Sequence, residues 1–404
     1  MEERKLANFF EQYLSHKSLF ANKQALQTDF QPEDILHRDE QITQVANVLA
    51  PILRGQKSNN LFIYGYPGTG KTLVTLFTPR QIKQAAEKLA LPVIVTYINC
   101  KLKRTADTEY RLVAQLAKEL GRPLPATGLP TDEVYKTFYE ELDAKKCTML
   151  LVLDEIDALV EKADDQLLYN LLRINEHLHN SRITLVGVSN NLTFKDTLDP
   201  RVRSSLSEEE LLFPRYNAVQ LLDILKQRAS LAFAPGVLED GVVQKCAALA
   251  AQDHGDARRA IMLLRTAAEL CEREHNETVG MAYLDVAESS MENERVLDCV
   301  RTQPKQHQAT LCAVLTACAE RQQAVFTGEI YEKYQALCGK ASLRPLTQRR
   351  VSDIIQEFDM LGLIQSKVIS KGRYGRTREI GIALPAATLA QVHAIVMEAL
   401  SIHG

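Results

Sequence analysis

The chain has 404 residues, of which 46% are hydrophobic and 25% charged, with a formal net charge of −3 at pH 7. This ordinary composition excludes disordered, collagen-like and disulfide-scaffold proteins, no apolar run approaches the roughly 18 residues of a membrane span, and the eight cysteines form no Cys-x-x-Cys pair. The charge is unevenly placed, since residues 300–404 carry 13 Lys and Arg against 8 Asp and Glu, which predicts a basic C-terminal module.

The first part of the chain has the pattern of an α/β fold. Residues 1–36 show no sustained strand pattern. The sequence Gln31-Pro32-Glu33-Asp34 within them predicts a turn that opens a helix. From 37 to 214, short apolar runs rich in β-branched residues alternate with amphipathic stretches. Strands separated by helices indicate βαβ units and a parallel sheet covered on both faces. The expected strands are 61–64, 93–98, 149–153 and 184–188.

The strongest motif follows the first strand and reads Gly65-Tyr66-Pro67-Gly68-Thr69-Gly70-Lys71-Thr72. A strand before it and a helix from Leu73 supply the context of a phosphate-binding P-loop, in which backbone N–H groups and a helix N-terminus surround phosphate oxygens. We expect Lys71 to reach the β- and γ-phosphates of ATP and Thr72 to ligate Mg²⁺. The residues expected to bind ATP or ADP are Gly65, Pro67, Gly68, Thr69, Gly70, Lys71, Thr72 and Leu73.

Polar residues also end the third and fourth strands, at the edge where ligands bind in open α/β sheets. Asp154 is expected to hold Mg²⁺, usually through water, and Glu155 to polarise the water that attacks the γ-phosphate. A single helix is predicted between these strands, which places the fourth strand beside the P-loop strand. Its terminal amides, Asn190 and Asn191, are candidates to contact that water or the γ-phosphate. Asn190 is nearer the strand end, and the choice between the two stays open.

A helical region follows Pro214. Segments 217–233, 238–252, 256–275 and 280–293 have helical spacing, which predicts a helical domain at 215–299 after a core at 1–214. Gly255 precedes the third of these helices and leaves Arg258 in its first turn.

Residues 300–404 are predicted to form a winged-helix domain. Helices at 309–320, 327–337 and 347–361 precede strands at 364–369 and 378–382, and Thr347 is the expected N-cap of the third helix. The stretch 367–378 has five basic residues and no acidic one. In a winged helix the third helix enters the major groove and the hairpin contacts the backbone or minor groove. The expected DNA contacts are Arg349, Arg350, Lys371, Arg373, Tyr374 and Arg376, with a protein-binding winged helix as the alternative.

In this order, the P-loop, the two polar strand ends and Arg258 resemble the AAA+ ATPases, in which a lid arginine touches the γ-phosphate. The resemblance narrows to the archaeal origin-recognition and cell-division-control replication initiators, over about residues 15 to 382. It rests on Ile35-Leu36-His37-Arg38-Asp39-Glu40-Gln41-Ile42, on Leu198-Asp199-Pro200-Arg201-Val202-Arg203-Ser204-Ser205-Leu206, and on Gly255-Asp256-Ala257-Arg258.

This resemblance implies an ATP-dependent initiator that binds double-stranded origin DNA and helps to recruit or load the replicative MCM helicase, with slow ATP hydrolysis as a switch. It implies a P-loop core, a helical lid and a winged helix in a cytoplasmic, nucleoid-associated protein, and related initiator subunits as further partners on DNA. It also implies that the segment around His37 and Arg38 lines the adenine and that Tyr216 and Arg228 contact the nucleotide. The residues alone indicate a hydrophobic anchor at Tyr216 and a surface charge at Arg228. Residues 101–104 would lead into a helical element that presses on DNA.

One feature departs from the AAA+ pattern. Many AAA+ proteins end the 198–206 box with an arginine that reaches a neighbouring subunit's nucleotide. Ser204-Ser205 stands there, and Arg201 and Arg203 come earlier, which puts an obligate ring in doubt and leaves open which arginine, if either, acts in trans. The runner-up function is an ATP-switched DNA-binding regulator of transcription or transposition. A clamp-loader-like or helicase-like ATPase would give no reason for a winged helix with a basic hairpin.

Overall fold

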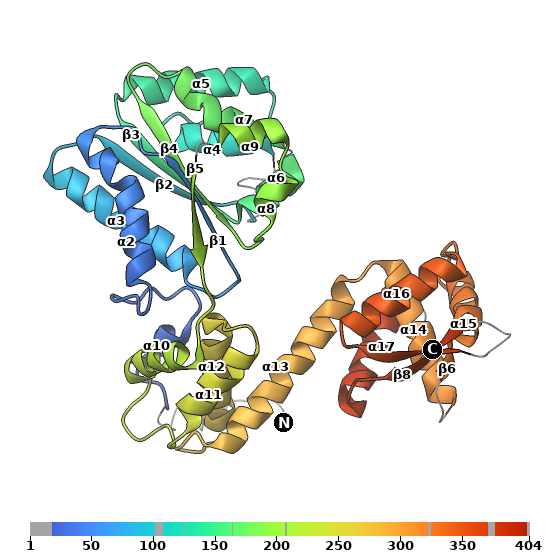
Figure 1. The fold of residues 1–404 in the computed structure, drawn as a ribbon. Coiled ribbons are helices and arrows are strands. Elements are labelled where there is room, and N and C mark those ends of the chain that lie inside the picture. Colours follow the sequence, from blue (N-terminus) through green and yellow to red (C-terminus); the bar gives the residue numbers. More distant parts are fainter. Residues whose placement is uncertain are drawn as a thin grey trace, which may run out of the picture. The chain divides into compact units, whose positions relative to one another are not determined.

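The fold is described from a computed structural model (Figure 1). It describes residues 18–101, 108–125, 127–163, 165–206, 208–321, 325–370 and 376–401. Contacts divide the chain into two compact units, Met1–Leu284 and Asp285–Gly404. Within the described residues, no helix combines the length and the apolar character needed to cross a membrane.

The first unit is built on a five-stranded parallel sheet in the order β2-β3-β4-β1-β5. Its first four strands confirm the predicted ones. The edge strand β5 was not predicted, because its first half is Glu208-Glu209-Glu210 and only its second half is apolar. The strands are β1 (Asn60–Gly65), β2 (Val93–Asn99), β3 (Thr148–Asp154), β4 (Arg182–Ser189) and β5 (Glu208–Phe213).

Helices cover both faces of this sheet (Figure 1). One face packs on α2 (Asp39–Leu49), η2 (Ala50–Arg54) and α3 (Lys71–Lys88). Side chains alternate between the two faces of a strand, so β3 sends Leu150 and Val152 to this side and Leu151 to the other. Burial on both faces therefore explains why β3 is apolar almost throughout. The other face packs on α4 (Glu109–Glu119), α5 (Thr131–Ala144), α6 (Ile156–Ala163), α7 (Asp165–Arg173), α8 (Phe194–Thr197) and α9 (Pro200–Ser205).

The connection from β3 to β4 differs from the prediction of a single helix. Two helices, α6 and α7, and the short η3 (Ile174–Glu176) lie between these strands. The expected position of β4 is nevertheless confirmed, because β4 pairs with β3 on one side and with β1 on the other. The carboxyl ends of β1, β3 and β4 therefore lie next to one another.

A helical lid follows β5. Asn217 and Gln220 form a capping box at the start of the first lid helix, and Asp256 caps the third by accepting two backbone N–H groups. The last helix continues to Thr302, beyond the predicted end at 293, and neither Pro nor Gly interrupts it. The helices are α10 (Ala218–Ala232), α11 (Val242–Gln252), α12 (Ala257–Arg273) and α13 (Met281–Thr302).

Residues 18–30, which we call the N-terminal strap, pack on the lid helices. The Leu19 N–H donates to the Glu272 carboxylate at 3.2 Å, and Lys23 pairs with Glu269 at 2.9 Å. The strap contains η1 (Lys23–Leu26), whose Ala25 and Leu26 are buried. The lid helices follow the sheet in the sequence, whereas the strap precedes it. The lid is therefore completed by a segment from the beginning of the chain.

The second unit has the predicted winged-helix order of three helices and a hairpin. Thr347 caps the third helix by accepting the Arg350 N–H, as predicted. A short strand, β6 (Val325–Phe326), joins the hairpin in the sheet order β6-β8-β7, and α17 (Ala386–Ala399) adds Val392 and Val396 to the core. Neither was predicted, and two residues are too few to show a strand period. The predicted elements are α14 (Lys305–Glu320), α15 (Thr327–Lys340), α16 (Gln348–Met360), β7 (Ile364–Ser370) and β8 (Arg376–Ile382).

Candidate functional site

The carboxyl edge of the sheet gathers the predicted nucleotide-site residues. The P-loop follows β1, Asp154 ends β3, and Asn190 comes directly after β4. Gly70 has a φ of +85°, a left-handed conformation that lets the loop turn directly into α3. Because neighbouring parallel strands end at the same edge, residues far apart in the chain meet here.

Lys71 lies inside the loop and is 5% exposed. Its Nζ donates to the main-chain oxygens of Gly65 at 2.7 Å and Tyr66 at 2.8 Å. Burial lowers the pKa of Lys71 to about 8, with Asp154 opposing the shift and the charge of Arg258 adding to it. The positive charges of Lys71 and Arg258 therefore repel each other at the phosphate loop. An anion bound between them would stabilise both charges.

Asp154 is the centre of the polar contacts. Its Oδ2 accepts the hydroxyl protons of Thr72 at 2.9 Å and Tyr97 at 2.7 Å, and its Oδ1 accepts the Glu155 N–H at 3.0 Å. Burial and the hydrogen bond to Asp154 raise the pKa of Tyr97, so its hydroxyl stays protonated. Sequence reasoning missed Tyr97 because it lies inside a strand that carries no motif.

The oxygens of Thr72 and Asp154 fit a magnesium ion. Octahedral Mg²⁺ holds its ligands at about 2.0–2.1 Å, which places neighbouring ligand atoms about 2.9 Å apart. The observed separation of Thr72 Oγ1 and Asp154 Oδ2 is 2.9 Å. Hydroxyl and carboxylate oxygens are also the hard donors that this ion prefers.

Glu155 has an unusual backbone conformation for a residue with a side chain. Its φ is +56°, and this left-handed turn separates the end of β3 from the start of α6. Its carboxylate lies 3.7 Å from Lys101 Nζ, and its side chain is 22% exposed. Strained residues cluster at functional sites, and Glu155 has this conformation at the carboxyl edge of the sheet.

The two asparagines after β4 have different surroundings. Asn191 Oδ1 accepts the N–H and the hydroxyl of Thr193, both at 2.9 Å, so this side chain caps the turn into α8. No described residue hydrogen-bonds the side chain of Asn190. Asn190 is thus the amide that is available for a ligand, in agreement with its position nearer the strand end.

The lid contacts the P-loop at Gly68, whose φ is +71°. A Cβ atom on Gly68 would lie 1.6 Å from Asp256 Oδ1, and the Ala257 N–H donates to the Gly68 carbonyl at 3.3 Å. Glycine is therefore needed for its conformation and for the close approach of the lid. This contact seats the first turn of α12, which contains the exposed Arg258, on the phosphate loop.

Arg38 and Tyr216 form a brace beside the same loop. Arg38 is 2% exposed and donates to the carbonyls of Thr69 at 2.9 Å and Pro214 at 2.7 Å. Its guanidinium carbon lies 3.7 Å from the centre of the Tyr216 ring, and burial lowers the pKa of Arg38. A Cβ atom on Gly70 would lie 2.7 Å from the Tyr216 hydroxyl, so this tyrosine borders the P-loop.

Arg228 is buried against the N-terminal strap. It donates to the carbonyls of Ala25 at 3.2 Å and Phe30 at 3.1 Å, and its guanidinium lies over the Phe30 ring. Burial lowers the pKa of Arg228 to about 10. The interpretation of Arg228 as a surface charge is therefore wrong, because the strap covers it. Its contact with nucleotide stays a prediction, since its described hydrogen bonds go to the strap.

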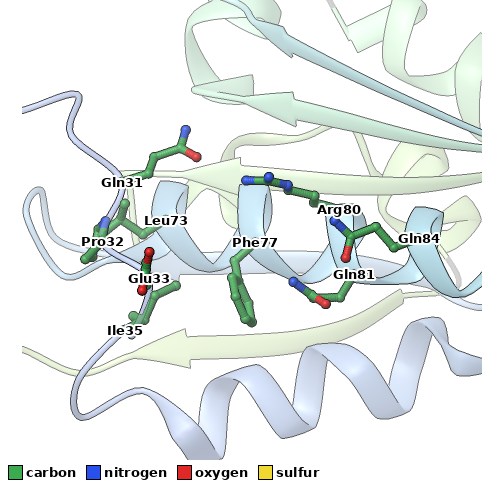
Figure 2. A pocket seen from close by; sticks show the side chains of 9 residues that line it. All are labelled: Gln31, Pro32, Glu33, Ile35, Leu73, Phe77, Arg80, Gln81 and Gln84. Carbon is green, nitrogen blue, oxygen red and sulfur yellow. The ribbon is translucent and has the colours of Figure 1, made fainter.

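A cavity of about 260 Å³ lies along α3 (Figure 2). Leu73, the third residue of α3, lines the cavity and directly follows the P-loop residue Thr72, and Ile35 lies two residues before His37. Apolar, amide and charged side chains line it together. The lining residues are Gln31, Pro32, Glu33, Ile35, Leu73, Phe77, Arg80, Gln81 and Gln84.

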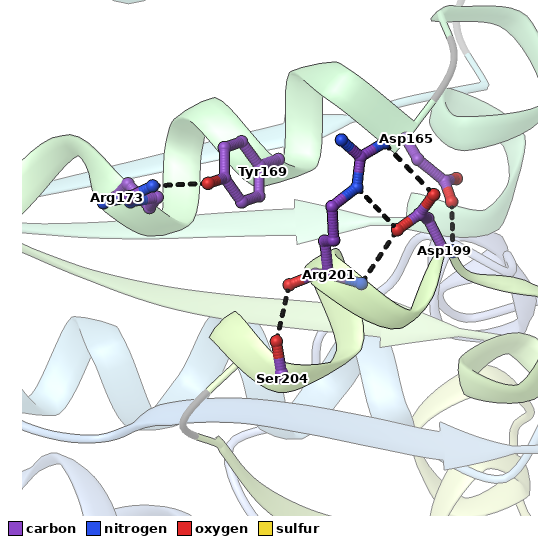
Figure 3. A network of polar contacts seen from close by, with 6 residues as sticks. All are labelled: Asp165, Tyr169, Arg173, Asp199, Arg201 and Ser204. Atoms are coloured by element: carbon purple, nitrogen blue, oxygen red, sulfur yellow. Dashed lines mark hydrogen bonds and ion pairs between the residues drawn. The ribbon is translucent and has the colours of Figure 1, made fainter.

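The 198–206 box contains two exposed arginines. The carboxylate of Asp199 accepts the main-chain N–H of Arg201 at 2.8 Å and its Nε at 3.1 Å, and the Asp199 N–H donates to Asp165 (Figure 3). The Arg201 side chain is 81% exposed. Arg203 lies 4.0 Å from Asp196. Arg201 is thus the more exposed of the two arginines, and the Asp199 carboxylate holds it at the surface.

The start of α16 presents Arg349 and Arg350, both exposed. Arg350 pairs with Glu357 at 3.4 Å, and Glu357 also lies 2.9 Å from His307 Nε2. Arg350 is therefore already engaged by a carboxylate of its own helix.

The predicted basic hairpin is described only in part. Arg378 donates to Gln356 Oε1 at 2.7 Å, which ties β8 to α16. Arg376 is the first residue of β8, whereas Lys371, Arg373 and Tyr374 lie outside the described residues. In the predicted second DNA region, Lys101 is described and 102–104 lie outside.

Three family profiles match the chain in the order of its parts. "AAA domain" matches residues 54–194, "Cdc6 AAA+ ATPase-type lid domain" matches 222–289, and "CDC6, C terminal winged helix domain" matches 298–392. ORC1-type DNA replication protein 1 of Archaeoglobus fulgidus is 50% identical over 373 residues, which cover 92% of this chain and 90% of that protein.

Solved structures agree with the fold. The Aeropyrum pernix ORC1 protein in complex with DNA is 41% identical, with a TM-score of 0.77 over 94% of this chain and 97% of that one. The Aeropyrum pernix ORC2 protein is 22% identical, with a TM-score of 0.62 over 95% of this chain and 100% of that one, which supports the fold alone.

Proposed function

Because this chain belongs to the family of ORC1-type DNA replication proteins, AAA+ ATPases that end in a winged helix, we propose that it is an ATP-dependent initiator. It binds double-stranded origin DNA and helps to recruit or load the replicative MCM helicase, together with related initiator subunits. The observation that carries the proposal is the close contact between the lid and the phosphate loop, at Gly68 and Asp256. The same chain also contains a winged helix.

The nucleotide site works through residues gathered at one edge of the sheet. Lys71 exchanges the carbonyls of its own loop for the β- and γ-phosphate oxygens, and Thr72 and Asp154 hold Mg²⁺. The ion, when bound, neutralises charge on the phosphates. Glu155 accepts the proton of the attacking water or orients that water, and Asn190 positions it. Arg258 reaches the γ-phosphate from the lid.

The nucleotide base occupies the cavity along α3. One wall of the cavity comes from α3, beginning at Leu73 directly after the P-loop, and the other comes from the segment before His37 and Arg38 (Figure 2). Tyr216 borders the loop from the lid side. The three functional parts are the core at 1–214, the lid at 215–299 and the winged helix at 300–404.

Hydrolysis serves as a slow switch. An arginine finger is worth about 10³–10⁵ in rate, and Ser204-Ser205 stands where many AAA+ proteins carry one. Loss of the γ-phosphate removes the anion shared by Lys71 and Arg258, which changes how the lid rests on the loop.

The DNA interface is the winged helix. Arg349 and Arg350 begin the helix that enters the major groove, and the hairpin with Lys371, Arg373, Tyr374 and Arg376 contacts the backbone or minor groove. Phosphate contacts of this kind position a protein on DNA, whereas base contacts give it specificity.

The test is footprinting on origin and random duplexes, with ADP and with a non-hydrolysable ATP analogue, combined with genome-wide mapping of binding sites. We expect sites concentrated at one or a few replication starts and a footprint that changes with the nucleotide in the wild type but not in Lys71→Ala. Sites at promoters or at the ends of mobile elements would favour the regulator instead. Absence of DNA binding would leave the winged helix as a protein-contact module.

A further inference from the structure

Tyr97 reaches the nucleotide site from a strand that carries none of its motifs. It lies in β2, the strand beside β3, in register with Val152, and two residues before the pair Asn99–Asp154. Its ring packs into the apolar cluster between the sheet and α3. Its hydroxyl extends from that cluster to Asp154 Oδ2 at 2.7 Å.

The Asp154 carboxylate needs groups that fix its rotation. The terminal torsion of an aspartate is broad, so hydrogen bonds decide which oxygen points where. The Glu155 N–H fixes Oδ1, and the hydroxyls of Thr72 and Tyr97 both bind Oδ2. Two of these three donors come from the site's own motifs, and the third is Tyr97, whose ring is partly buried.

Thr72 has two tasks once a metal ion is present. Its hydroxyl ligates the cation through a lone pair while its proton still donates to Asp154, so its position depends on the ion as well as on the carboxylate. Tyr97 donates to the same Oδ2 and has no part in ligating the ion. Its ring is anchored in the core, so little conformational freedom is lost when it makes this bond.

We infer that Tyr97 is a positioning residue for the metal: by holding Oδ2 of Asp154, it presents the carboxylate to the magnesium ion of the nucleotide. This inference rests on the proposed function, in which Thr72 and Asp154 hold that ion. Groups that orient a metal ligand typically contribute 10–100-fold to metal affinity, as an order of magnitude.

Tyr97→Phe tests the inference, because it removes only the hydroxyl. The probe is a fluorescent ADP analogue, titrated first with EDTA and then with increasing Mg²⁺, so the readout does not depend on hydrolysis. We expect the Mg²⁺ concentration at half-maximal response to rise about tenfold or more. Affinity in EDTA should change much less, because the hydroxyl contacts no phosphate-loop residue among those described.

Tyr135→Phe is the matched control. Tyr135 is another tyrosine of this unit, itself buried, and its hydroxyl likewise donates to a carboxylate, Glu109 Oε1, at 2.8 Å. If loss of such a bond merely loosened the fold, both variants would shift the Mg²⁺ response equally. Equal shifts, or no shift in Tyr97→Phe, would overturn the inference.

A double-mutant cycle asks whether Tyr97 acts through Asp154. In an Asp154→Asn background, Tyr97→Phe should have little further effect on the Mg²⁺ response, since the carboxylate that it holds is gone. A full additional effect in that background would contradict the inference. If nucleotide binding by the wild type did not depend on Mg²⁺, the proposed metal site itself would be overturned. Failure of the inference about Tyr97 and failure of the proposed metal site are therefore distinguishable.

Discussion

The basic residues of the nucleotide site and those of the winged helix have different kinds of hydrogen-bond partner. Lys71 is buried, and its partners are main-chain oxygens of the loop that contains it. Arg350 and Arg378 are bound instead to the side chains of Glu357 and Gln356. The fold keeps the first cation inside the loop where a phosphate would bind, whereas the other two cations pair with side chains.

This difference decides what a substitution does. An exposed ion pair contributes about 0–1 kcal/mol, so an arginine at the surface can leave its partner for a phosphate at small cost. Lys71 is enclosed by its loop and, in the proposed function, meets the phosphates directly. We therefore expect large effects from single changes in the nucleotide site and graded effects from changes on α16.

The largest effect is expected from Glu155→Gln. This change keeps the shape of the side chain and removes its ability to accept a proton, so hydrolysis should fall by about 10²–10⁴. ATP binding should remain near that of the wild type. Single-turnover hydrolysis and equilibrium binding measure the two quantities separately, and unchanged turnover would remove Glu155 from the mechanism.

Lys71→Ala should come next, with a loss of ATP affinity of about 10–100-fold, because hydrogen bonds to charged groups contribute about 1.5–3 kcal/mol. Equilibrium binding of a fluorescent ATP analogue measures it, and wild-type affinity in this variant would contradict the loop assignment.

The wild type should show a matching pH dependence. Because burial lowers the pKa of Lys71 to about 8, the free protein keeps this proton below that pH and loses it above. Binding of phosphates above about pH 8 must restore the proton, so affinity should fall by up to about tenfold per pH unit. Lys71→Arg, which stays charged, should show a flatter profile above pH 8.

Gly68→Ala tests whether the lid must rest on the loop. Gly55→Ala is the matched control, because Gly55 has a φ of +68° and no atom within 4 Å of an added Cβ. Both changes introduce similar backbone strain, of about 1 kcal/mol. Only Gly68→Ala pushes Asp256 away, and we expect it to weaken ATP binding by about tenfold. Equal affinities for the two variants would contradict the conclusion that ATP binding needs the contact between Gly68 and Asp256.

The smallest effect is expected at the DNA end. Glu357→Gln removes the charge that engages Arg350 and should raise DNA affinity by about two- to fivefold, in keeping with the free energy of an exposed pair. Arg350→Ala should lower affinity, and adding Glu357→Gln to it should no longer raise affinity. Fluorescence anisotropy at fixed salt measures all of these, and a gain in the double variant would show that Glu357 acts by another route.

The sequence predicted those parts of the fold that short patterns determine. Strands β1, β3 and β4 are apolar because both of their faces are buried, the edge strand β2 is rich in β-branched residues, and the P-loop is a local motif, so all of these could be identified without the structure. The edge strand β5 could not, because its acidic half resembles a loop. The sequence motifs also predicted Thr72 and Asp154 as the residues that hold Mg²⁺, but they gave no indication of Tyr97.

What sequence reasoning missed depends on contacts between distant segments. Arg228 has the local spacing of a surface residue, and only the strap makes it a buried one. The contact of Gly68 with Asp256 joins the loop to a lid helix. Such pairs have no local signature, since each partner is compatible with many environments until the chain is folded.

The N-terminal strap also sets an order of events during synthesis. Ala25 leaves the ribosome long before Arg228, which is 203 residues further along the chain. At about 5–20 residues per second, the strap waits roughly 10–40 s for its partner. The sheet ends at Phe213, before the first lid helix begins, so the sheet can assemble while Leu26 is still uncovered. The lid can be completed only after the sheet, around a segment made earlier, and a chain begun after residue 30 would leave Arg228 uncovered and without its carbonyl partners.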